Sequence, residues 1–123
     1  MNENTIAYRQ IHPSFVQGGF PTSQAFRPTP KDQSQLSVYD GDLIASEKAW
    51  VHYTAELGHA SGGVMGLIVA ECAAESLAVR SAPEPFPEHA VIDFAELTDK
   101  ECRNRSKKLQ CKAVERGWLY RAS

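Results

Sequence analysis

The segment that decides the fold is "TDKECRNRSKKLQCKAVERG", residues 98–117. Thr98 and Glu101 have the spacing of a capping box, in which each side chain accepts a hydrogen bond from the other residue's backbone N–H at the start of a helix. Gly117 is the residue type that most often ends a helix in the left-handed conformation. The segment therefore predicts a helix over residues 98–116. The apolar side chains expected to pack against the core are Cys102, Leu109, Ala113 and Val114.

A second helix is predicted over residues 44–57. Ser46 is expected to cap its start, and Gly58 is expected to end it in the left-handed conformation. His52 lies at the edge of the stripe that would be buried. The apolar stripe consists of Ala49, Trp50, Tyr53 and Leu57, which recur at helical spacing.

The rest of the pattern indicates strands joined by turns. Strands are expected at residues 6–12, 35–39, 62–72 and 89–94, and "Asp-Gly-Asp" at 40–42 is typical of a turn. Residues 69–79, "VAECAAESLAV", fit a helix equally well. Residues 118–120 are expected to fold back onto the core. Short connections favour antiparallel pairing, so the predicted fold class is α+β, with a small, mainly antiparallel sheet and two main helices.

Length and charge limit the classes of function. The chain has 123 residues and a formal net charge of −2, which fits a single domain over residues 1–123 and argues against general DNA binding. It contains no apolar run of about 18 residues, so no membrane span is expected. The N-terminus lacks the features of a secretory signal, and the three cysteines show no CxxC spacing. We therefore expect a cytoplasmic protein with reduced thiols.

Residues 13–35 form a long region without helical periodicity. Prolines and the Gly18-Gly19 pair exclude a regular helix there, while Phe15, Phe20 and Phe26 supply apolar anchors at short intervals. Compact domains seldom keep so long an irregular segment without a functional reason. The sequence therefore predicts a long ordered loop region that carries function.

Candidate ligand-binding residues lie in and beside this loop region. Arg9 and Arg27 offer planar sets of donors suited to a phosphate, and Lys31 and Ser23 could add further contacts. His12, which ends the first strand, and His89, which opens a later one, are the candidate residues for proton transfer. The alternative is structural: Arg9 pairs with an acidic neighbour, His12 bonds to backbone, Arg27 is a solvated turn residue, and His89 is a capping or surface residue.

A basic run and the acidic turn are two further candidate sites. Residues 103–112, "RNRSKKLQCK", could contact phosphates together with Arg27 and Lys31, or could form a solvated helix face that suits the helix dipole. The pattern at 40–42 lacks the glycine and glutamate of a calcium loop, and the histidines lack zinc-site spacing. No metal site is predicted, and no cofactor is assigned.

Two functions remain open from the sequence. The order of Tyr8-Arg9, Gly18-Gly19, "SQAF" at 23–26 and "LSV" at 36–38 resembles small folds that bind NAD or RNA phosphates, although no glutamate matches their catalytic position. The first hypothesis is a domain that binds a phosphate-bearing ligand such as a nucleotide or an RNA end, with or without catalysis. The second is a non-catalytic protein–protein interaction module, such as an immunity, antitoxin or adaptor protein. Its candidate anchors are Phe15, Phe20, Phe26, Phe86 and Trp118.

Overall fold

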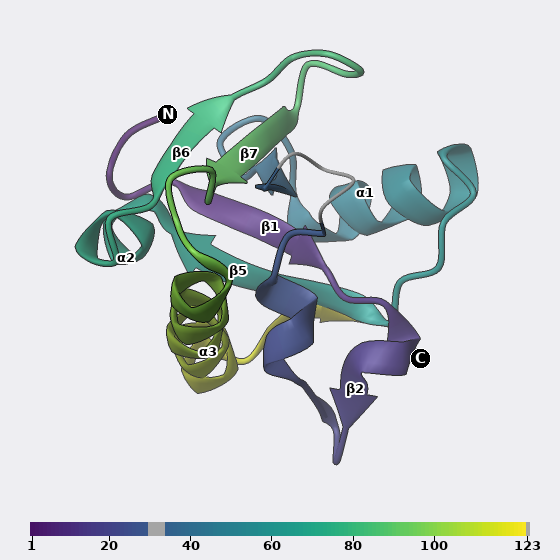
Figure 1. Ribbon diagram of the computed structural model, residues 1–123. Helices are drawn as coiled ribbons and strands as arrows, with labels where there is room; N and C mark the ends of the chain where they lie inside the picture. The colour runs from purple at the N-terminus through teal and green to yellow at the C-terminus, as the bar shows by residue number, and fades with distance from the viewer. Residues whose placement is uncertain (30–33, 123) are drawn as a thin grey trace.

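The computed structural model describes residues 1–29 and 34–122, and its centre is a six-stranded sheet (Figure 1). The strand order is β6-β7-β4-β1-β5-β8, and every neighbouring pair is antiparallel. The predicted α+β class with a mainly antiparallel sheet is therefore confirmed. The strands are β1 (Ile6–Gln10), β4 (Gln35–Asp40), β5 (Gly63–Ile68), β6 (Ala78–Ser81), β7 (His89–Asp93) and β8 (Trp118–Arg121).

The two predicted main helices are both present. The first is α1 (Ser46–Val51), which continues into a π-helical segment, η4 (His52–Glu56), and the second is α3 (Asp99–Arg116). The capping box of α3 forms as expected: Glu101 N–H donates to Thr98 Oγ1 over 3.2 Å, and Thr98 N–H donates to the Glu101 carboxylate over 3.0 Å. None of the helices formed by the described residues is both long and apolar enough to cross a bilayer.

The start of α1 differs from the expectation. Ala45 occupies the N-cap position, so the prediction that Ser46 caps this helix is wrong. The Ser46 hydroxyl instead donates to the backbone carbonyl of Leu119, 3.4 Å away, on strand β8. The Ser46 hydroxyl, which the local sequence predicts to cap the helix, therefore bonds to a neighbouring strand in the folded protein. Gly58 follows the helix with a φ of +74°, in the left-handed region where it was predicted.

The apolar run at 62–72 divides into two elements. Its first part forms β5, and its second part begins the short helix α2 (Val69–Ala74). The strand ends at Ile68, opposite Ile6, which is the first residue of its partner β1. The Glu71 carboxylate then accepts a hydrogen bond from the Ile68 N–H over 2.9 Å, which starts α2.

Helices α1 and α3 cover opposite faces of the sheet. Alternate residues of a strand point to opposite faces, so Ala7 packs into the main core with Leu109 of α3, while Tyr8 packs into a second cluster with Ala49 of α1. The main core also takes in Val38, Met65, Leu67, Ile92 and Phe94.

The described part of the long loop region folds into short elements. These are the 3₁₀ helix η1 (Pro13–Phe15), the hairpin of β2 (Val16–Gln17) and β3 (Phe20–Pro21), and the 3₁₀ helix η2 (Ser23–Phe26). The Phe26 side chain is fully buried in the main core, and its backbone carbonyl accepts a hydrogen bond from Ser106 of α3 over 3.2 Å. The later part of this segment, β3 and η2, is therefore attached to α3.

Candidate functional site

Arg9 lies on β1 and is bound to backbone carbonyls on two sides. Its Nε donates to the carbonyl of Ala25 over 2.8 Å, and its Nη1 donates to the carbonyl of Ser37 over 2.9 Å. The side chain thus joins η2 to β4, and these hydrogen bonds to backbone carbonyls give Arg9 a structural role.

His12 and Ser23 begin the two 3₁₀ helices of the loop region. His12 is the N-cap of η1, where its Nδ1 accepts a hydrogen bond from the Ser14 N–H over 3.1 Å. Ser23 is the first residue of η2. Within residues 1–29 and 34–122, no hydrogen bond or ring contact joins His12 to His89. Lys31 lies outside the described residues.

His89 is held on strand β7 beside an exposed serine of β4. Its Nδ1 lies 2.8 Å from the carbonyl of Ala82, an oxygen that only accepts, so Nδ1 carries the proton. The other ring nitrogen, Nε2, then accepts from the Ser37 hydroxyl, 3.2 Å away. Sequence reasoning missed this pair because 52 residues separate its members.

Arg27 follows η2, which packs against helix α3, and lies near the basic run of that helix. Arg27 and Arg103 line the same cavity of about 350 Å³ together with Asp99. Among the described residues that line this cavity, two therefore carry a guanidinium group and one carries a carboxylate. Arg27, a predicted ligand-binding residue, and Arg103, from the predicted basic run 103–112, thus line one cavity.

The exposed side of α3 continues this positive charge. Lys100, Arg103 and Lys107 are exposed and follow one another at intervals of three and four residues, which places them on one face of the helix. We call Arg27, Lys100, Arg103 and Lys107 the basic face. Among the described residues, none of these four cations forms an ion pair within 4.0 Å.

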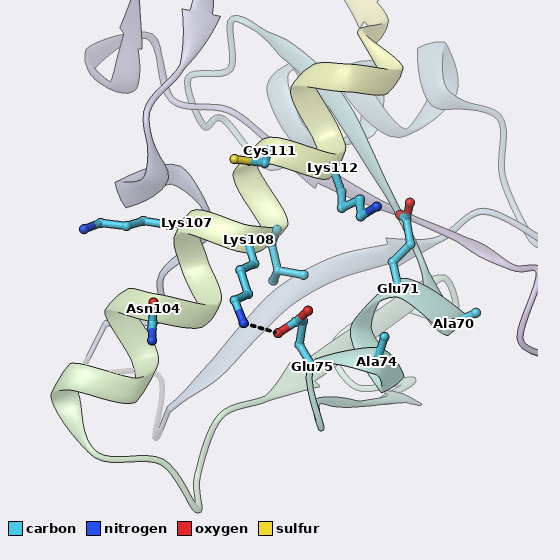
Figure 2. A pocket seen from close by; sticks show the side chains of 10 residues that line it. Ala70, Glu71, Ala74, Glu75, Asn104, Lys107, Lys108, Cys111 and Lys112 are labelled. Atoms are coloured by element: carbon cyan, nitrogen blue, oxygen red, sulfur yellow. Dashed lines mark ion pairs between the residues drawn. The ribbon is translucent and has the colours of Figure 1, made fainter.

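The neighbouring side of α3 has a different electrostatic character (Figure 2). A cavity of about 500 Å³ separates α2 from α3, and both of its carboxylates are paired with cations. Glu75 lies 3.3 Å from Lys108 Nζ, and Glu71 lies 2.7 Å from Arg116 Nη2. Figure 2 shows Lys107 pointing away from α2, so its charge is not neutralised by these glutamates.

The three cysteines are free thiols in different surroundings. Cys72 is fully buried, and burial, aided by the nearby Glu71 carboxylate, raises the pKa of its thiol to about 12. Cys111 is exposed and lines the cavity between α2 and α3. The part of the chain that the structure describes contains no cluster of three or more metal-ligating side chains.

No protein-family model, curated protein or solved structure matches this chain. The candidate site therefore rests on its geometry alone. It is a row of cations on α3 that have no ion-pair partner in residues 1–29 and 34–122, with Arg27 near them.

Proposed function

We propose that this protein binds a phosphate-bearing partner, such as an RNA end, along the basic face of α3. The observation that carries the proposal is that Lys100, Arg103 and Lys107 share one exposed helix face, with no ion-pair partner among the described residues, and that Arg27 lines the same cavity as Arg103. Lysine and arginine side chains are the groups that neutralise phosphates in protein–nucleic acid contacts.

The position of these cations within α3 supports a binding role. Lys100 lies in the first turn, where the positive end of the helix dipole makes a cation unfavourable. The helix dipole therefore explains the cations near the C-terminus of α3 but not Lys100. An anionic partner at this end would gain from the dipole as well as from the side chains.

The spacing of the cations favours a ligand with several phosphates. Seven residues of α-helix separate Lys100 from Lys107, which is about 10 Å along the axis. Side chains spread over that length are better suited to a chain of phosphates than to a single one. Because the whole chain carries a net charge of −2, the attraction is local to this face.

A cytoplasmic location is part of the same proposal. Its support is that all three cysteines are free thiols, a state typical of reducing compartments.

The test is the binding of a short fluorescein-labelled single-stranded RNA, followed by fluorescence anisotropy. Arg103→Glu and Lys107→Glu should each weaken binding by roughly tenfold, because each replaces an attraction with a repulsion. The matched control is Lys48→Glu, which makes the same change of charge on the exposed surface of α1. It should leave affinity within about twofold, since it lies across the sheet from α3.

Two outcomes would contradict the proposal. If all three variants weaken RNA binding equally, binding depends only on the net charge of the protein. If the wild type shows no saturable RNA binding, the proposed function is wrong. Because all three side chains are exposed, each variant should unfold within about 0.5 kcal/mol of the wild type, as checked by urea denaturation.

A further inference from the structure

Exposed apolar side chains gather around helix α1, on the opposite side of the sheet from the basic face. Leu43 is 58% exposed, Val51 is 42% exposed and Leu57 is 41% exposed. Leu43 and Val51 both line a cavity of about 800 Å³ alongside α1, together with Ile44. Single exposed leucines are ordinary on a protein surface, but large aliphatic side chains that line one cavity mark a binding surface.

The rim of this cavity, which we call the α1 groove, carries unpaired negative charge. Of the described residues that line it, Glu47, Glu56 and Glu88 are acidic and Lys48 is the single cation. Within the described residues, none of the three carboxylates has a cationic partner within 4.0 Å. A partner that covers the apolar side chains would therefore also gain from carrying lysine or arginine at its edges.

The wall of the groove is fixed by contacts from the sheet. His52 lines the cavity, and its Nδ1 lies 2.8 Å from the Tyr39 hydroxyl. Its ring also meets the ring of Phe86 at 4.6 Å between centroids. These two contacts hold the His52 ring in place and leave Nε2 as the nitrogen that can bond to a partner. The groove therefore offers one polar atom beside its apolar side chains.

We propose that the α1 groove binds a protein segment that is basic and amphipathic, with aliphatic side chains inserted between Leu43 and Val51 and with cations beside Glu47, Glu56 and Glu88. A short helix is the form that fits best. Glu47 lies in the first turn of α1 and Glu56 ends the π-helical segment η4, so cations two or three turns apart on a partner helix can reach both. This partner differs in chemistry and location from the anionic ligand proposed for α3.

The experiment uses the full chain and a fluorescein-labelled helical peptide with leucines at every third and fourth position and lysines elsewhere. Two comparison peptides replace all lysines by glutamate or all leucines by alanine. Saturable binding of the leucine–lysine peptide is expected, with roughly tenfold weaker binding of each comparison peptide. Absence of saturable binding, or equal binding of the glutamate peptide, overturns the proposal.

Variants of the protein locate the peptide. Val51→Ser should weaken binding by roughly tenfold, whereas Phe20→Ser, which removes another exposed apolar side chain, should not weaken it. Glu47→Gln combined with Glu56→Gln should weaken binding in the same way, against Glu96→Gln combined with Glu3→Gln as a control with the same change of net charge. Equal effects of the site and control variants overturn the proposal.

Light scattering tests the other occupant, a second copy of the chain. The wild type should be monomeric at the concentrations used for peptide binding. A dimer that Val51→Ser dissociates would mean that the groove is filled by the protein itself, and this result also overturns the proposal.

Discussion

The guanidinium of Arg9 and the backbone carbonyl of Ser37 lie 2.9 Å apart, where strands β1 and β4 stop pairing with each other. The two strands share the register pairs Ala7–Asp40 and Tyr8–Tyr39, and beyond them Arg9 supplies the donor that the backbone no longer provides. A residue predicted to bind a ligand thus connects two strands and a loop.

Arg9→Met should therefore destabilise the protein, because it leaves two backbone carbonyls without their donor. We expect the free energy of unfolding to fall by about 2–3 kcal/mol in urea denaturation. Arg103→Met, on the exposed face of α3, should change it by no more than about 0.5 kcal/mol. An unchanged free energy of unfolding in Arg9→Met would show that these two hydrogen bonds contribute little stability. Arg9 would then remain a candidate ligand-binding residue only.

The number of cations in the basic face sets the salt dependence of RNA binding. If three to four cations contact phosphates, the logarithm of the association constant should fall with the logarithm of salt concentration with a slope of about −2 to −3. Lys107→Gln should make this slope shallower by about 0.7. Anisotropy titrations at several salt concentrations measure it, and an unchanged slope would show that Lys107 does not contact a phosphate.

Glu71 should contribute stability that depends on pH. Burial alone would raise the pKa of its carboxyl, but hydrogen bonds from Arg116 and from the Ile68 N–H outweigh it and hold that pKa below its ordinary value of 4.5. A lowered pKa means that the stabilisation is complete above about pH 4.5 and is lost as the pH falls through the value in the folded protein.

Glu71→Gln should accordingly lower the free energy of unfolding by about 1–3 kcal/mol at pH 7 and by less at about pH 3. Denaturant unfolding at both pH values gives the difference. Glu115→Gln, an exposed change on the same end of α3, is the control and should show little effect at either pH. A pH-independent loss at position 71 would point to packing rather than charge.

Gly41 should tolerate no side chain. A Cβ at this position would overlap the backbone carbonyl oxygen of Ile6, and that oxygen already accepts a hydrogen bond from the Gly41 N–H over 2.8 Å. Gly41→Ala should cost about 2–4 kcal/mol of unfolding free energy. Gly58→Ala, where a Cβ would meet open space but φ is +74°, should cost about 1 kcal/mol. Equal costs would argue against the clash.

The cysteines should react with an aromatic disulfide reagent in a fixed order. Cys111 is exposed and should react first, whereas Cys72 should react only on unfolding, because it is buried and its thiol pKa is raised to about 12. RNA bound along the basic face should slow the reaction of Cys111, which lines a cavity together with Lys107. Reaction of Cys72 in the native protein would contradict its burial.

Local patterns predicted the elements whose ends are set by nearby residues. The capping box of Thr98 and Glu101 and the glycines at 58 and 117 marked helix ends correctly, because their hydrogen bonds and φ angles involve only a few residues. The Asp40 carboxylate also accepts from the Asp42 N–H over 2.9 Å, as the turn signal indicated. Strand β6 was missed because its pairing with β7 is not visible in its own short sequence.

The sequence by itself determined the α+β class, the two main helices and the basic character of α3, since periodicity, caps and charge are properties of short segments. The tertiary structure alone decided which side chains meet: Arg27 beside Arg103, Ser37 beside His89, and Leu43 beside Val51 in one groove. These contacts depend on strand register and on which face of the sheet each helix covers. Both are set by long-range packing, for which a single sequence carries no local signal.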